Sequence, residues 1–324
     1  MAVEEQAPEA VDQTASGAAG KPSHVVRRSF LGGLFGAVVG GGGYLVTAGV
    51  LPGRTTLFET LGLDGSDGEL PRVDPGELHI GTFRSAARGD ADTGWVLALP
   101  PGAAFDRLKA PGRQPLPVCV LLHGRGDSAT SLVDIGYDRF LARATMTGLP
   151  PFAIAAVDGG DRYWHRRSAG DDTGRMIVDE LLPMLARAGL RSEPRDRIAL
   201  MGYSMGGYGA LLLGSELGPA RVAAVVAESP ALWTSPAEAA PGAFDGTADF
   251  VRNDVFARRK TLAEIPIKID CGLADPFYRA AKQFAEGMDP APAGTFGRGD
   301  HDYGYWRAVA PSSVAFVGQA LARS

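Results

Sequence analysis

The sequence predicts an α/β fold in which one open, mostly parallel sheet is covered by helices on both faces. Helical patterns, the clearest from Thr173 to Ala188, alternate with short and largely apolar runs. Runs of this kind are typical of parallel strands buried on both faces, and their alternation with helices favours a single layered domain. The five runs are Val118–Leu122, Phe152–Val157, Ile198–Leu200, Val222–Ala227 and Ile265–Ile269.

Two further elements bound this pattern. Residues 76–83 and 95–99 flank a turn rich in Arg, Gly and Asp, which predicts a leading antiparallel hairpin. The last helix is expected from about Tyr305 to Ala322. We therefore expect the folded domain to occupy residues 76–324.

Composition excludes several classes of function. Hydrophobic residues make up 45% of the chain, which supports a substantial core, and the net charge of -5 gives no electrostatic case for nucleic acid. The chain has no zinc-ligand spacing and no phosphate-binding loop, so we expect neither a metal nor a cofactor. Cys119 and Cys271 both lie in apolar runs and are expected to be buried, unpaired thiols.

Residues 1–51 are expected to direct the chain out of the cytoplasm. Residues 1–23 have a disordered composition, and Arg27-Arg28 precede a weakly hydrophobic stretch from Phe30 to Leu51. This arrangement resembles a twin-arginine signal, which implies the twin-arginine translocation machinery as a partner and an extracellular or envelope location. Cleavage after Ala48 and retention as a membrane anchor both remain open. The Gly-, Pro- and Asp-rich residues 52–75 are expected to form a linker.

Ser204 is the candidate nucleophile. It lies in Gly202-Tyr203-Ser204-Met205-Gly206, between the apolar run 198–200 and a small-residue helical stretch. A Gly-x-Ser-x-Gly at a strand-to-helix junction is the nucleophile elbow of α/β-hydrolases. Side chains at Gly202 and Gly206 would collide with the neighbouring strand and helix at such a sharp turn.

The base and the acid follow from chain order. A serine hydroxyl needs a histidine within hydrogen-bonding reach and an acid that orients the histidine, and in this fold the order is Ser, acid, His. His301 is the only histidine after Ser204. Asp275 follows the strand 265–269 at its carboxyl end, where ligand sites of such sheets lie. Glu228 is the alternative acid, whereas alternation turns Asp270 away from the site.

Two backbone amides are candidates for the oxyanion hole. One is the amide of Met205, directly after the nucleophile. The other belongs to the loop after strand 118–122, at Gly124 or Arg125, of which we select Arg125. His123 precedes Ser204 and is expected to brace this loop.

With these residues placed, residues 76–324 resemble the esterase D and antigen 85-like branch of α/β-hydrolases. The resemblance implies hydrolysis of small-molecule, lipid or polysaccharide carboxylic esters, or acyl transfer to an alcohol. The stretches that carry it include Leu121-Leu-His-Gly, Asp158-Gly-Gly, Gly202-Tyr-Ser-Met-Gly-Gly and Gly299-Asp-His-Asp-Tyr-Gly-Tyr-Trp.

Two residues depart from the mycolyltransferase pattern. His123 stands where those enzymes have Asp, and Asp275 is an aspartate where they use glutamate. Hydrolysis is therefore the favoured activity, acyl transfer is the alternative, and a non-catalytic binding protein is a third hypothesis. Trp164, His165 and Trp233 are candidate substrate contacts, with aromatic packing under loops as the competing role.

Overall fold

The computed structural model describes residues 60–62 and 64–324. The predicted tail and signal segment, residues 1–51, lie outside this range. Within it, the chain forms a seven-stranded sheet with the strand order β1-β2-β4-β3-β5-β6-β7. The hairpin strands are β1 (Leu78–Ser85) and β2 (Ala91–Ala98). The other strands are β3 (Val118–Leu122), β4 (Ala153–Val157), β5 (Ile198–Tyr203), β6 (Val222–Glu228) and β7 (Ile267–Asp270).

The strand directions confirm the predicted fold class. β1 pairs with β2, and β2 with β4, in antiparallel register, whereas β3 to β7 are mutually parallel. β7 begins two residues later than expected because Pro266 has no N–H to donate to the sheet. The carboxyl ends of the parallel strands consequently meet at one edge, where the loops that follow them gather.

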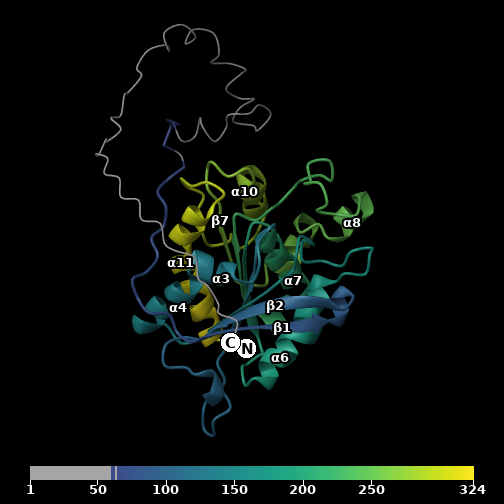
Figure 1. The fold of residues 1–324 in the computed structure, drawn as a ribbon. Coiled ribbons are helices and arrows are strands. Elements are labelled where there is room, and N and C mark those ends of the chain that lie inside the picture. The colour runs from purple at the N-terminus through teal and green to yellow at the C-terminus, as the bar shows by residue number, and fades with distance from the viewer. Residues whose placement is uncertain (1–59, 63) are drawn as a thin grey trace, which may run out of the picture. The chain divides into compact units, whose positions relative to one another are not determined.

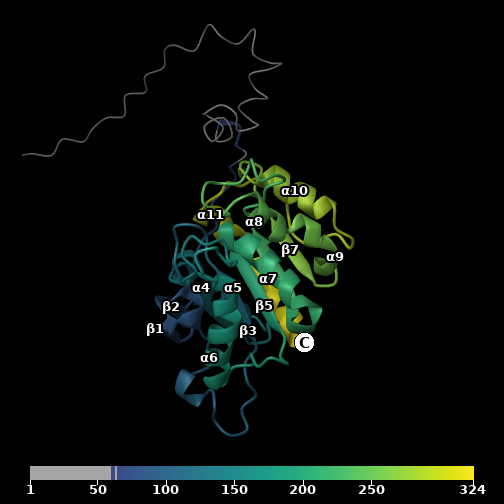
Figure 2. The ribbon, with the colours of Figure 1, turned by 90° about the vertical axis from the view of Figure 1, so that its right-hand side faces the viewer.

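Helices cover both faces of the sheet (Figure 1). One layer contains α3 (Ser131–Ile135), α4 (Tyr137–Met146) and α11 (Tyr303–Ala322). The opposite layer, which faces the viewer in Figure 2, contains α5 (Thr173–Met176), α6 (Leu182–Arg187), α7 (Met205–Arg221), α9 (Arg259–Leu262) and α10 (Tyr278–Glu286). The short α8 (Thr247–Arg252) belongs to the excursion between β6 and β7.

The expected helix 173–188 forms, but not as one regular α-helix. Residues 177–181 make a π turn between α5 and α6. Pro183 follows this turn, and because proline lacks an N–H and crowds the preceding turn, the α-helical hydrogen-bond pattern cannot pass through it unchanged. Among residues 60–62 and 64–324, none of the helices has the length and apolar character needed to cross a membrane.

Part of the predicted linker packs against the domain instead of lying free. The Gly68 amide donates to the Gly304 carbonyl over 2.8 Å, and Arg139 Nη1 donates to the Val73 carbonyl over 3.0 Å. Leu70 contacts the backbone at Gly136, between α3 and α4. We name residues 64–73 the strap. Its composition reads as a linker because most of these contacts use backbone groups, which leave no signature in side-chain pattern.

Candidate active site

Ser204 occupies a strained turn between β5 and α7. Its φ of 54° and ψ of -121° are unfavourable for a residue with a side chain. Backbone hydrogen bonds hold the turn, since the Ser204 amide donates to the Glu228 carbonyl over 2.9 Å and the Ala231 amide donates to the Ser204 carbonyl over 2.9 Å. A Cβ at Gly202 would lie 2.3 Å from the Gly206 carbonyl oxygen, so only glycine fits there.

His301 lies within hydrogen-bonding distance of Ser204. The distance from His301 Nε2 to Ser204 Oγ is 2.9 Å, across 97 positions of sequence. The loop before α11 that carries His301 is fixed from two sides. The amides of Leu273 and Ala274 donate to the carbonyls of Gly297 and Gly299, and on the other side the strap contacts Gly304, in the first turn of α11 directly after the loop.

Asp275 completes the hydrogen-bonded chain. It is fully buried, and its Oδ2 lies 2.8 Å from His301 Nδ1. Its Oδ1 accepts from the Phe277 amide over 2.7 Å, which fixes the carboxylate plane. A proton on Nδ1 that is donated to Asp275 leaves the Nε2 lone pair free for the Ser204 hydroxyl proton. The arrangement can therefore deprotonate Ser204 and stabilise the imidazolium that results.

The two competing acids have other partners. Glu228 is buried and accepts a 2.5 Å hydrogen bond from the Tyr137 hydroxyl, and burial raises the pKa of Glu228 to about 7. Asp270 is paired with Lys268 and accepts from the Thr295 amide. Alternation does turn Asp270 away from the serine, but its face of the sheet is covered by α11, whose Ser313 contacts Lys268. Neither carboxylate hydrogen-bonds to His301.

The predicted oxyanion loop passes beside Ser204. A Cβ at Gly124 would lie 3.4 Å from Ser204 Cβ, which places the backbone of Gly124 and Arg125 next to the nucleophile. On the other side, Met205 is the first residue of α7, so its amide has no acceptor within the helix. His123 braces the loop as expected. Its Nε2 accepts from the Gly159 amide over 2.9 Å, its Nδ1 donates to the Gly124 carbonyl, and burial lowers its pKa.

Comparison with known proteins identifies the family. The family model described as putative esterase matches residues 91–311, which is more than half of the chain. The chain belongs to the putative esterase family. This finding confirms the resemblance drawn from the motifs and supports carboxylic ester hydrolysis as the chemistry of the site. No curated protein sequence matches the chain.

Solved structures of esterases share the fold. A ferulic acid esterase superposes with a TM-score of 0.64 at 19% identity, covering 76% of this chain and 100% of its own. The fluorophosphonate-binding serine hydrolase FphF of Staphylococcus aureus gives 0.61 at 19% identity, covering 76% and 99%. The S-formylglutathione hydrolase FrmB of the same organism gives 0.60 at 18% identity, covering 75% and 98%. At such identities the likeness shows the fold alone.

Two expected substrate contacts of this esterase are interior residues. Trp164 is 1% exposed, its Nε1 donates to the His123 carbonyl over 3.3 Å, and its ring covers Gly209 so closely that a Cβ there would lie 2.4 Å away. His165 is also buried, with Nε2 3.1 Å from Asp249 Oδ2. Both side chains pack beneath the loops and are almost fully buried, and their role as substrate contacts stays a prediction.

Trp233 remains a candidate contact, and Phe277 joins it. The Phe277 ring centroid lies 5.3 Å from that of His301, and the half-buried Trp233 lies 5.6 Å from Phe277. These rings form an aromatic wall beside the base. Sequence reasoning missed Phe277. Its position two residues after the acid is a usable signal, because the Phe277 amide donates to Asp275 and so holds Phe277 beside the site.

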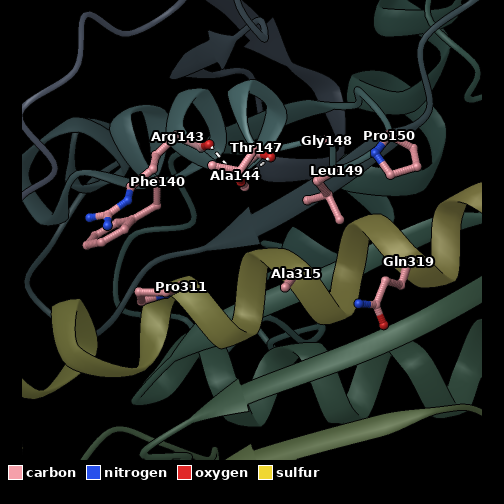
Figure 3. A pocket seen from close by; sticks show the side chains of 10 residues that line it. All are labelled: Phe140, Arg143, Ala144, Thr147, Gly148, Leu149, Pro150, Pro311, Ala315 and Gln319. Carbon is pink, nitrogen blue, oxygen red and sulfur yellow. Dashed lines mark hydrogen bonds between the residues drawn. The ribbon is translucent and has the colours of Figure 1, made fainter.

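One cavity lies away from these residues. This pocket, of about 640 Å³, lies between α4 and α11 and is lined in part by Phe140, Leu149, Pro311 and Gln319 (Figure 3). Leu149 and Pro150 directly precede β4, so this pocket lies toward the amino ends of the strands, opposite the edge that carries Ser204. Nowhere in the described part of the chain do three or more His, Cys, Asp or Glu side chains gather as a metal ion would need.

Proposed function

We propose that this esterase is an exported serine hydrolase that cleaves carboxylic esters through an acyl-enzyme on Ser204. The observation that carries the proposal is the continuous chain of contacts from Ser204 Oγ to His301 Nε2 and from His301 Nδ1 to Asp275 Oδ2. A serine in a strained turn, a partly exposed histidine and a fully buried aspartate can serve as the nucleophile, the base and the orienting acid of nucleophilic catalysis.

The proposed reaction has two halves. His301 Nε2 takes the Ser204 hydroxyl proton while Oγ attacks the ester carbonyl carbon, and the amides of Met205 and Arg125 donate to the oxyanion that forms. Collapse of this intermediate breaks the bond to the alkoxy oxygen, which leaves as the alcohol with the proton from His301. In the second half, His301 takes a proton from water while the water oxygen attacks the carbonyl carbon of the acyl-enzyme. The bond to Ser204 Oγ then breaks, Oγ takes the proton back from His301, and the carboxylic acid is released.

The aromatic wall is proposed to contact the ester beside the scissile bond. Trp233 and Phe277 are both partly exposed, and Phe277 contacts the base itself. Planar or apolar groups would gain contact area there without a charged partner. A panel of p-nitrophenyl esters of increasing acyl length would define how large a group this wall accepts.

Substitution of the nucleophile tests the mechanism. Ser204→Ala is expected to abolish labelling by a fluorophosphonate probe and to lower kcat/KM by roughly a thousandfold or more. Ser229→Ala is the matched control, because Ser229 also has a positive φ, of 47°, and its buried Oγ has no hydrogen-bond partner among the described residues. Full labelling of Ser204→Ala, or loss of labelling in Ser229→Ala, would contradict the assignment.

Export by the twin-arginine route is proposed from the sequence motif alone. Conversion of Arg27 and Arg28 together to Lys keeps the charge and removes the guanidinium pair, so precursor is expected to accumulate in the cytoplasm of the native host. Arg54→Lys, outside the motif, serves as the control. Immunoblots of cytoplasmic and exported fractions decide the matter, and undiminished export of the double variant rejects this route.

A further inference from the structure

A polar pocket near α8, separate from the one between α4 and α11, is lined by several arginines. It has a volume of about 570 Å³ and is lined by Arg166, Arg167, Arg252 and Arg258, with Asp249 as its one acidic lining residue. The chain as a whole carries a net charge of -5, so this cluster runs against the balance of the protein. No residue of the proposed triad takes part in it. We name it the arginine pocket.

Asp245 and Asp249, beside the arginine pocket, each accept hydrogen bonds on both carboxylate oxygens. Asp245 Oδ1 accepts from Arg167 Nε and Nη2, and its Oδ2 accepts from the Ser168 amide. These hydrogen bonds, the one from Arg167 foremost, lower the pKa of Asp245. Asp249 accepts from Arg252 and Asn253 on Oδ1, while its Oδ2 accepts from the Asp245 amide and contacts His165. Each of these two acids is therefore already engaged with an arginine of the pocket.

The guanidinium groups of Arg166, Arg252 and Arg258 have N–H donors that no hydrogen bond uses among the described residues. Within residues 60–62 and 64–324, Arg166 makes no side-chain hydrogen bond or ion pair, and the residue is exposed. Arg252 has a side chain 69% exposed and uses Nη2 for Asp249. Arg258 donates to the Arg252 carbonyl and lies 3.8 Å from Glu216. Because a guanidinium has five N–H donors in a planar fork, these groups present unused donors that an oxyanion could accept from.

We propose that the arginine pocket is a binding site for a tetrahedral oxyanion, the phosphate or sulfate group of a ligand. Arg166 and Arg252 supply the charge and the forked donors, Arg258 adds a third cation, and Arg167 is a fixed support, since it is 6% exposed and held by Asp245. Guanidinium forks bind phosphate oxygens by paired, charge-assisted hydrogen bonds. Binding there requires no contribution from Ser204, so the proposal is independent of ester hydrolysis.

Calorimetric titration of the folded protein with inorganic phosphate at low ionic strength tests this site. Wild type is expected to bind one phosphate. Arg166→Gln is expected to raise the dissociation constant by about tenfold or more, because one pair of charge-assisted hydrogen bonds is lost. Among the described residues, the Arg166 side chain has no hydrogen-bond or ion-pair partner, so this variant should fold as wild type does. Arg252→Gln should weaken binding similarly, and circular dichroism checks its fold because Asp249 loses a donor.

The matched control is Arg84→Gln on β1. Arg84 is 72% exposed and lies 4.0 Å from Asp90, so its substitution removes the same charge outside the pocket. Unchanged phosphate binding in Arg84→Gln, with loss in Arg166→Gln, supports the site. A parallel titration with glycerol 3-phosphate separates a free anion from a phosphomonoester: tighter binding that depends on Arg166 assigns the pocket to a larger phosphorylated ligand. Absence of binding to wild type, or equal weakening by Arg84→Gln, overturns the proposal.

Discussion

Two histidine–aspartate pairs in this esterase have almost the same hydrogen bond and very different surroundings. His301 Nδ1 lies 2.8 Å from Asp275, and His165 Nε2 lies 3.1 Å from Asp249. The His301 side chain is 22% exposed and directs its second nitrogen to Ser204. The His165 side chain is 2% exposed and directs its second nitrogen to the Tyr163 carbonyl. A histidine–aspartate contact therefore identifies a base only when the remaining nitrogen faces a nucleophile.

The carboxylates of the two pairs also differ in what else they hold. Asp249 joins α8 to the loop at His165 through its contact with His165, and it also accepts from Arg252, Asn253 and the Asp245 amide, so its hydrogen bonds stabilise a segment of structure. Asp275 accepts from the Phe277 amide besides His301, and this second bond fixes the carboxylate's own position. The first arrangement is a structural crosslink, whereas the second orients one side chain.

The largest effect is expected when the two aspartates are changed in the same way. Asp275→Asn should keep the fold and lower kcat/KM by roughly a hundredfold to ten-thousandfold, because an amide cannot stabilise the imidazolium of His301. Asp249→Asn should leave kcat/KM within about threefold and lower the free energy of unfolding by about 1–3 kcal/mol, since a buried network loses an acceptor. Assays with a short p-nitrophenyl ester, together with thermal unfolding, measure both. Comparable losses of kcat/KM in two folded variants would break the distinction between the pairs.

A third buried carboxylate, Glu228, sharpens the comparison through its pH dependence. Burial raises its pKa from 4.5 to about 7, so the folded protein holds a proton between these values that the unfolded chain releases. The associated stability is present below pH 4.5 and is lost as pH rises through about 7, by about 3 kcal/mol at most.

Glu228→Gln should remove this loss while retaining activity within about threefold, because Glu228 does not contact His301. The stability of the variant relative to wild type is expected to increase from pH 5 to pH 8, as measured by chemical unfolding. Glu286→Gln, at a side chain 68% exposed, is the control and should show no such trend. A crippled but folded Glu228→Gln enzyme would instead make Glu228 the acid of the triad.

The smallest expected effect concerns the strap, which contacts α11 directly after the loop that carries His301. A Cβ at Gly68 would lie 2.1 Å from the Ala308 amide nitrogen, so Gly68→Val should lift the strap from α11. Displacement of His301 is expected to lower kcat by up to about tenfold with a smaller change in KM. Glu69→Val, at the neighbouring exposed position, is the control. Unchanged kcat in a Gly68→Val protein with a demonstrably released strap would show that the strap does not position His301.

The sequence by itself determined the features that depend on local pattern. The strand β3 was predicted with its observed bounds, and the remaining parallel strands to within a few residues, because continuous apolar runs are a property of short stretches of chain. The elbow at Ser204 was predicted because its steric demand falls on Gly202 and Gly206, which neighbour it in sequence. The chain order then singled out His301 by elimination.

Tertiary structure alone decided which side chains meet. Asp275, Glu228 and Asp270 all lie near the carboxyl ends of β6 and β7 and are all buried. Their positions in the sequence favoured Asp275 and left Glu228 open, and their packing partners distinguish the three. The same holds for Trp164 and His165, whose aromatic character suits a binding surface as well as an interior. Asp249, the partner of His165, lies 84 positions away. Local sequence pattern determines the path of the backbone, whereas the burial and pairing of a side chain depend on residues distant in sequence. Burial and pairing in turn determine whether a polar side chain takes part in the reaction or stabilises the structure.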